Sequence, residues 1–324
     1  MTAHSAGVAE EQVAPDEAAL AAEFVTFLKD ASMKRHPTGV MRRFNQGRAA
    51  GCVDAEFIVD EALAPELRVG LFTRPACFRA RIRFANATSQ SDTERDVRGM
   101  SIKVLSVPGD NLTPGVADQD FILNSHPVMM VGGTREFLAL LRAVDAGGAR
   151  AALFFLTHPR AASVAVSSRQ HATSHLEIPY WSTTPYLFGP GQSVKYIVRP
   201  ASRQTTPLPS PLTPGYLAER LAAHLSRQDA LFDFFVQFQT DRRRMPIEDA
   251  SIEWRERDSP YRRVAQIRIP SQRLDEAPTV TACEEMTFNP WHALHEHRPL
   301  GGFNRARREI YRAMAEFRRA SPKS

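Results

Sequence analysis

The stretch RFANATSQSDTERDVRGMSIKV, residues 83–104, ends one strand-like run, crosses a polar turn region and begins a second run. The two runs, ARIRFAN and MSIKVLSV, alternate apolar with polar residues, and Ser, Thr and Asp fill the region between them. Similar short runs occur at residues 52–59 (CVDAEFIV) and 119–125 (QDFILNS). Short alternating runs separated by turn residues favour antiparallel pairing. Residues 51–131 are therefore expected to form a multi-stranded, mainly antiparallel region.

The rest of the chain mixes helices with three more strand-like runs. Further strands are expected at residues 195–201, 231–240 and 264–271. Helical spacing of apolar residues predicts helices at residues 17–33, 135–145, 149–156, 216–225 and 304–320, with more loop than helix at residues 160–214. Asn304 is expected to cap the last of these helices. The fold class predicted from this pattern is α+β.

Composition limits the class of protein. With 324 residues, 43% of them hydrophobic and 24% charged, the chain is typical of an ordinary globular protein. Residues 1–15 are expected to be a mobile tail. No internal repeat occurs, so residues 16–324 are expected to form a single domain. The chain has neither a secretory leader pattern nor an apolar run of membrane-spanning length. Cys52, Cys77 and Cys283 are too scattered for a disulfide framework, so inert thiols and a cytoplasmic location are expected.

Arginine dominates the basic residues. Lys and Arg together number 41, and only five of them are lysine. Such a surplus fits nucleic-acid binding, a buried anionic group, or a compositional bias with solvated side chains. No helix-turn-helix or RNA-binding motif occurs, and the phenylalanines of residues 231–240 have strand spacing typical of a core. Nucleic-acid binding is therefore disfavoured.

The last expected helix places two arginines around a tyrosine. Arg307, Tyr311, Met314 and Arg318 are spaced i, i+4, i+7 and i+11, so they share one face. A cation one turn away stabilises the phenolate form of a tyrosine, and a phenolate suits ferric iron. The same spacing also fits an arginine-rich surface helix with one half-buried tyrosine. Spacing alone leaves both interpretations open.

Three segments resemble the heme catalases. Residues 83–104 are similar to the catalase pattern RFST…DT.RD.RG.A.K, and the last helix resembles the heme-ligand pattern Arg-x-x-x-Tyr with a second arginine seven residues after the tyrosine. Residues 288–311, FNPWHALHEHRPLGGFNRARREIY, resemble short single-domain catalase-like proteins, a group that includes allene oxide synthase-like enzymes. The resemblance extends over roughly residues 40–320.

The resemblance implies a catalase-type closed antiparallel β-barrel core, with surrounding helices and a C-terminal heme-ligand helix. It also implies a heme b cofactor whose iron takes Tyr311 as axial ligand, with Arg307 against the tyrosine. Arg43, Arg83 and Arg318 correspond to the catalase arginines that hold the heme propionates. Other arginines are expected to be solvated, among them Arg305, Arg308, Arg312 and Arg319.

The distal side departs from the catalase pattern. Aligning on Arg43 and Gly51 places Gln46 where catalases have their distal histidine. An amide donates and accepts hydrogen bonds but does not serve as a general base near neutral pH, so catalase activity is expected to be weak or absent. Either Ser125 or Asn124 corresponds to the second distal residue, and these side chains with Gln46 would orient a bound peroxide.

The residues near this distal segment also differ from those of the catalases. Met129 and Met130 replace paired aromatic residues, which favours an adaptable apolar pocket and an organic substrate. His126 is expected to point away from the pocket if the strand alternation continues. His292, His295 and His297 resemble a loose metal cluster, but they are expected to brace the last helix instead.

The leading hypothesis is a heme-dependent peroxidase or peroxygenase acting on an organic substrate or hydroperoxide. One alternative is a hydroperoxide-rearranging or biosynthetic tailoring heme enzyme, which needs no proton-shuttling histidine. A second alternative is a non-enzymatic heme-binding or sensor protein. Expected partners are hydrogen peroxide or an organic hydroperoxide and a small organic substrate, and a homo-oligomer is expected by analogy with catalases.

Overall fold

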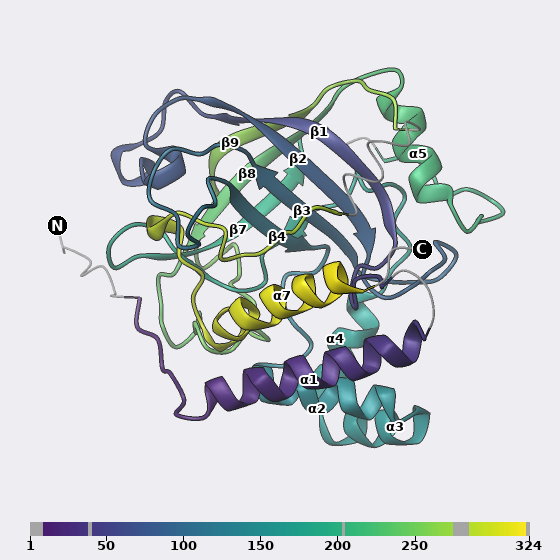
Figure 1. Cartoon of the computed structure of the whole chain (residues 1–324). Helices are drawn as coiled ribbons and strands as arrows, with labels where there is room; N and C mark the ends of the chain where they lie inside the picture. Colours follow the sequence, from purple (N-terminus) through teal and green to yellow (C-terminus); the bar gives the residue numbers. More distant parts are fainter. Residues whose placement is uncertain (1–8, 38–40, 203–204, 275–284, 322–324) are drawn as a thin grey trace.

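The computed structural model describes residues 9–37, 41–202, 205–274 and 285–321, and its centre is a closed antiparallel β-barrel (Figure 1). Within these residues, eight strands close a ring in the order β5-β4-β3-β2-β1-β9-β8-β7, with β5 paired to β7, and the short β6 adds to β7. The strands are β1 (Ala49–Val59), β2 (Cys77–Asn86), β3 (Arg98–Val104), β4 (Gln119–Asn124), β5 (Tyr180–Trp181), β6 (Tyr186–Leu187), β7 (Ser193–Pro200), β8 (Ala230–Phe238) and β9 (Arg262–Ile269). The predicted barrel and the α+β class are confirmed.

Side chains fill the barrel. Strand alternation sends Phe57, Phe121 and Phe234 inward, where their ring centroids lie 4.8–5.9 Å apart. All three are at most 1% exposed, and a continuous apolar cluster surrounds them. Because the interior is packed, a ligand site has to lie outside the barrel wall.

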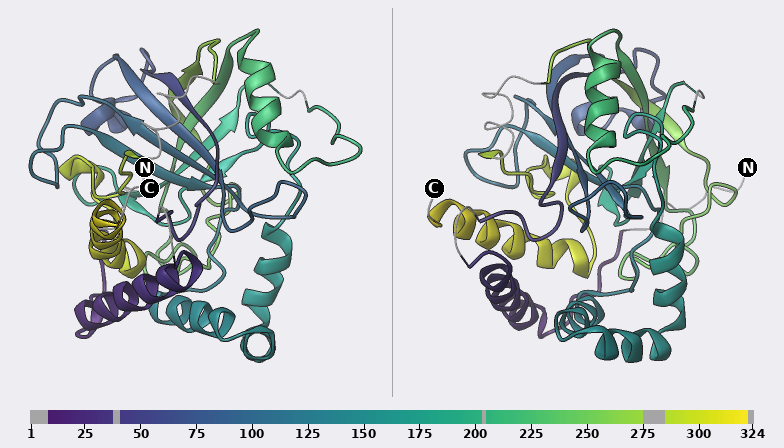
Figure 2. Two further views of the ribbon diagram at one scale, coloured as in Figure 1. Left: turned by 45° about the vertical axis from the view of Figure 1, so that its right-hand side comes forward. Right: turned by 90° about the vertical axis from the view of Figure 1, so that its right-hand side faces the viewer.

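Six α-helices occur in the described residues, and five of them lie on one side of the barrel. The six are α1 (Glu17–Arg35), α2 (Thr134–Asp145), α3 (Gly148–Thr157), α4 (Pro159–Ser168), α5 (Tyr216–Leu225) and α7 (Gly302–Ala320). Figure 1 shows α7 between the barrel and α1, and α1 packs along α7. Figure 2 shows α2, α3 and α4 on the same side as α1, whereas α5 lies against β1. No helix in the described residues has the length and apolarity needed to cross a membrane.

Residues 160–214 contain more loop than helix, as expected, and α4 begins at Pro159, which takes the first helical turn, a position that needs no backbone N–H donor. The expectation for Asn304 is wrong. Helix α7 begins at Gly302 after Gly301, so Asn304 lies inside its first turn and does not cap it. Gly301 has φ 84°, and a Cβ there would lie 2.5 Å from the Ile247 carbonyl oxygen, so only glycine fits this turn.

A buried ion pair fastens the segment before α7 to the barrel. Lys103 Nζ lies 2.7 Å from Asp120 Oδ1, and the other carboxylate oxygen is 2.9 Å from His292 Nδ1. Asp120 Oδ2 also accepts a hydrogen bond from the backbone N–H of Asn289 at 2.9 Å. Nearby, His297 is fully buried, which lowers its pKa to about 4. The described residues hold no group of three metal-ligating side chains, and His292 contacts Asp120 on β4. A bracing role for the three histidines stays a prediction.

The cysteine expectation needs one correction. Cys52, on β1, is disulfide-bonded, whereas Cys77 is free and exposed. Cys283 lies outside the described residues. The expectation of inert thiols is therefore wrong for Cys52, because sequence spacing does not show which segments the fold brings together.

Candidate functional site

A cavity of about 340 Å³ lies between α7 and the outer face of β2, β3 and β4. Seven residues singled out in the sequence line it: Arg43, Gln46, Arg83, Asn124, Arg307, Tyr311 and Arg318. They come from the loop before β1, from two strands and from the last helix. A volume in this range is typical of sites for small molecules and cofactors. The fold therefore gathers the candidate residues of distant segments around one space.

The helix α7 supplies one wall of the cavity. Tyr311 faces the cavity together with Ile310 and Met314. Arg307, one turn before Tyr311, donates from Nη1 to Thr184 Oγ1 and Asn304 Oδ1, both at 3.1 Å. These two acceptors hold the guanidinium next to the tyrosine face of the helix, so a positive charge is fixed on the side from which a phenolate would be stabilised.

A buried tyrosine lies behind this wall. Tyr186 is fully buried on β6, and burial raises its pKa to about 12, against the opposing effect of the Arg307 charge. Tyr186 therefore stays protonated under ordinary conditions. Tyr186 does not line the cavity, so Tyr311 is the phenol that faces it.

Arginines line two further parts of the cavity. Arg43 donates to the Met286 carbonyl oxygen at 2.8 Å, and Arg318 donates to the same oxygen at 3.5 Å, so two guanidinium groups converge there. Arg83, only 1% exposed on β2, donates to the Gln46 carbonyl oxygen at 2.8 Å. Two guanidinium groups thus lie together beside the cavity, and guanidinium is a bidentate partner of carboxylates.

Gln46 lies opposite the helix wall. Its backbone has φ 57°, an uncommon conformation for a residue other than glycine. The Gln46 backbone N–H donates to the Ala87 carbonyl oxygen at 2.8 Å, and the Gln46 backbone carbonyl accepts from Arg83. The side chain lies over Gly99, because a Cβ added there would come within 2.5 Å of Gln46 Cδ.

The sheet register places a second amide beside Gln46. Gly99 on β3 is paired with Asn124 on β4, and paired residues in an antiparallel ladder point to the same face with Cβ positions about 5 Å apart. The Gln46 side chain lies over Gly99 of this pair. Two neutral amides therefore line the same cavity as Tyr311.

Of the two candidates for the second distal residue, Asn124 lines the cavity and Ser125 does not. Ser125 instead continues the strand pairing, since its backbone N–H donates to the Arg98 carbonyl at 2.8 Å and its hydroxyl accepts from the Arg98 amide at 2.9 Å. The expectation that Ser125 shares the distal role has no support from this geometry.

His126 lines the cavity, contrary to the sequence expectation. Strand β4 ends at Asn124, so alternation no longer decides the direction of the following side chains. His126 Nδ1 lies 3.2 Å from the Val128 carbonyl oxygen, and Nε2 lies 3.5 Å from Ser167 Oγ on α4. The proline at position 127 was the only signal in the sequence that the strand would stop here.

The remaining walls are apolar. Val97, Ile122, Val128, Met129, Met130, Phe137 and Val164 line the cavity on the side of Gln46 and of helices α2 and α4, while Phe303, Ile310, Met314 and Phe317 line it from α7. A space with two apolar sides, a helix phenol and converging arginines at its edge matches a flat apolar group that carries two carboxylates. The residues present therefore fit a heme.

Comparison with known proteins shows the fold. No protein-family model matches the sequence, and the curated proteins include no match. Among solved structures, a bacterial catalase superposes with a TM-score of 0.70 at 14% identity over 98% of this chain, and catalase A from Saccharomyces cerevisiae with 0.68 at 15% over 90%. A fungal catalase gives 0.63 at 16% over 84%.

The chain therefore has the catalase fold. It spans only 58–64% of the length of these three catalases. At such low identity the likeness defines the fold, and the chemistry has to be argued from this chain's own cavity.

Proposed function

We propose that this protein is a heme b-dependent oxidoreductase that carries out a peroxidase or peroxygenase reaction on an organic substrate or hydroperoxide, with little catalase activity. One observation supports this proposal above the others. The amides of Gln46 and Asn124 line the same cavity as Tyr311 and its neighbouring arginines, and the Gln46 side chain lies over Gly99. A cytoplasmic location and a homo-oligomeric state stay predictions from the sequence.

When bound, heme b would supply the redox-active iron for reaction with a peroxide. Tyr311 would ligate the iron from α7, and the fixed guanidinium of Arg307 would keep the phenol oxygen anionic. Arg43, Arg83 and Arg318 would pair with the propionates. The apolar walls would exclude water from both faces of the cofactor.

The distal amides can orient a peroxide, since each has an N–H₂ donor and a carbonyl acceptor. Neither amide can accept the peroxide proton as a general base, a contribution worth about 10²- to 10⁴-fold in rate. His126 lines the cavity too, but its Nδ1 is directed to the Val128 carbonyl. Gln46 and Asn124 therefore position the substrate and leave proton transfer to the substrate or to water.

The apolar wall favours one alternative within the enzymes. Met129 and Met130 offer polarisable, adaptable contacts suited to an acyl chain. Rearrangement of an organic hydroperoxide, or tailoring of another organic intermediate, needs no general base on the protein and would use the same wall. A heme-binding sensor without turnover would use only the wall that α7 supplies with Tyr311.

Cofactor binding is tested with Tyr311→Phe. Purified with added hemin, this variant is expected to lose heme or to show a displaced Soret band, because phenylalanine offers no ligand oxygen. Tyr261→Phe is the matched control, since Tyr261 lies against Trp181 on β5 and does not line the cavity. A full heme complement with an unchanged Soret band in Tyr311→Phe would refute the assigned ligand.

The reaction type is tested by parallel assays of the heme-loaded protein. Oxygen evolution from hydrogen peroxide is expected to be slow, whereas an organic hydroperoxide with an oxidisable co-substrate is expected to be turned over. Conversion of a fatty-acid hydroperoxide to an isomeric product without consumption of co-substrate would favour rearrangement. Ligand binding without turnover of any peroxide would favour the sensor.

A further inference from the structure

The outer face of α3 is apolar and exposed. Arg150 is the only charged residue among the ten residues of this helix. Leu153 and Leu156 are 61% and 79% exposed, and together with Ala149 and Ala152 they form a stripe at i, i+3, i+4 and i+7. We call these four residues the α3 face.

The opposite side of α3 is apolar as well. Phe154 and Phe155 point inward into a cluster that includes Met129, Met130 and Phe137. A helix that is apolar on all sides is normally buried in a protein core or in lipid. Because α3 lies at the lower edge of the molecule in both views of Figure 2, the fold itself does not cover the α3 face.

The surroundings of the α3 face are basic. No Asp or Glu occurs between Asp145 and Glu177, a stretch that contains three arginines at positions 150, 160 and 169. Arg150 and Arg169 are exposed. Exposed leucines flanked by arginines, without acidic residues, are typical of helices that lie on an anionic lipid surface.

Charge also argues against a second copy of the chain as the occupant. A two-fold interface on this face would bring the same surface against itself, so Arg150 of each copy would approach the exposed arginines of the other copy. Like charges opposed across an interface disfavour association. An anionic surface has no such penalty.

The α3 face is connected to the candidate site. Its inner neighbours Phe154 and Phe155 pack with Met129 and Met130, and these methionines line the cavity. Val164 and Ser168 of the next helix, α4, line the cavity too. A single layer of side chains thus separates the α3 face from the wall of the cavity.

We propose that the α3 face binds the surface of an anionic lipid bilayer and that the substrate is an acyl-chain hydroperoxide taken from that bilayer. The leucines enter the boundary between headgroups and acyl chains, and Arg150 pairs with lipid phosphates. The choice of substrate rests on the proposed function, whereas the binding itself depends only on this face. The helices α3 and α4 then place the apolar cavity wall next to the lipid.

Binding is tested by sedimentation of the full chain with vesicles of phosphatidylcholine alone and of phosphatidylcholine with phosphatidylglycerol. Co-sedimentation is expected with the mixed vesicles and is expected to weaken in high salt, because surface charge attraction is screened. The double variant Leu153→Ser/Leu156→Ser is expected to bind at least about tenfold more weakly, and so is Arg150→Glu. Leu231→Ser is the control, because Leu231 is 41% exposed on β8, away from α3.

Two results would overturn the lipid assignment. One is equal binding of the mixed vesicles by the parent protein and both α3 variants. The other is a parent dimer in light scattering that Leu153→Ser/Leu156→Ser converts to a monomer, which would assign the face to a second copy. Turnover of a water-soluble hydroperoxide is measured alongside. Turnover without vesicle binding by the parent protein would refute the lipid proposal and leave the proposed reaction standing. Vesicle binding without turnover would refute the proposed reaction and leave the lipid binding standing.

Discussion

Gly99→Ala is expected to disturb the distal amide without unfolding the protein. The added methyl carbon would lie 2.5 Å from Gln46 Cδ, and ordinary contact begins at 3.4 Å, so the amide has to retreat by about 1 Å. The atoms that must move end a flexible side chain, so the free energy of unfolding should fall by no more than about 1 kcal/mol. A misplacement of about 1 Å at a reacting centre reduces rates by about 10²-fold. We therefore expect kcat/KM for a soluble organic hydroperoxide to fall by about 10²-fold, with heme content and Tm nearly unchanged.

A double-mutant cycle with Gln46→Ala makes this test specific. Once the amide is removed, Gly99→Ala has nothing to displace, so it is expected to have little further effect. Gly148→Ala is the matched control, because a Cβ at Gly148 meets nothing within 4 Å. An equal loss of activity from Gly99→Ala in the parent and in the Gln46→Ala protein would refute the idea that Gly99 acts by making room for Gln46.

Three more perturbations test the site and its supports. Gln46→His is expected to raise oxygen evolution from hydrogen peroxide by about 10²-fold or more, and an unchanged rate would mean that the missing base does not limit catalase activity. Asp120→Asn removes the closer of the two carboxylates beside the buried Lys103, the other being Asp118 at 3.7 Å, so urea unfolding should show a loss of about 3 kcal/mol, whereas a loss below about 1 kcal/mol would contradict the bracing role. Arg305→Ala is expected to lower Tm at neutral pH, and the difference from the parent should shrink below pH 4.5, the ordinary pKa of the Glu11 and Glu17 carboxyls. A difference that stays constant down to pH 3 would count against the ionic contribution.

The sign of that pH dependence follows from the two carboxylates. Burial opposes ionisation of Glu11, but hydrogen bonds from the Gly301 amide and Arg298 outweigh it and lower the Glu11 pKa. A hydrogen bond from Arg305 lowers the Glu17 pKa. Groups with a lowered pKa in the folded state stabilise it above their ordinary pKa and lose this contribution as the pH falls.

The alternation of apolar and polar residues was sufficient to predict the long strands. The seven expected strands correspond to β1, β2, β3, β4, β7, β8 and β9. One side of each strand faces the packed interior, so apolar residues alternate with other residues along its sequence. Strands β5 and β6 have two residues each, which is too short for any period. The sequence therefore predicted the long strands of the barrel but not β5, which closes the ring, or β6, which adds to β7.

The site was predictable where a motif carried it and not where folding alone created it. Gln46, Asn124 and Tyr311 were found by alignment to a family pattern, and they line one cavity. His126 was missed because the end of β4 could not be located from alternation. The role of Gly99 could not be read from the sequence either, since it depends on a loop more than fifty residues earlier that folds over it.

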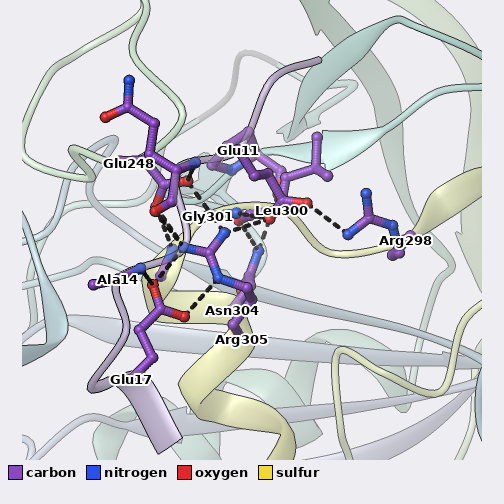
Figure 3. A network of polar contacts seen from close by, with 12 residues as sticks. Glu11, Ala14, Glu17, Glu248, Arg298, Leu300, Gly301, Asn304 and Arg305 are labelled. Atoms are coloured by element: carbon purple, nitrogen blue, oxygen red, sulfur yellow. Dashed lines mark hydrogen bonds and ion pairs between the residues drawn. The ribbon is translucent and has the colours of Figure 1, made fainter. Parts of the chain in front are cut away.

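Arg305 shows why a count of arginines does not reveal their roles. It was expected to be solvated, yet its side chain is 15% exposed and its guanidinium lies 2.6 Å from Glu11, 2.7 Å from Glu17 and 2.9 Å from Glu248 (Figure 3). Two of these partners precede it by 294 and 288 residues, beyond the reach of any local pattern. Glu11 also accepts from Gly301, and Glu248 from Gly302, where α7 begins.

This network links the start of the chain to the helix that carries Tyr311. Three carboxylates around one guanidinium fix the first turn of α7, and Arg307 and Tyr311 follow within two turns. Residues 9–15, part of the expected tail, thus include a contact that orients the proximal wall of the cavity. In a chain that begins after Glu11, only two carboxylates hold the start of α7. Such a chain should therefore keep its barrel and show a larger loss in heme affinity than in fold stability.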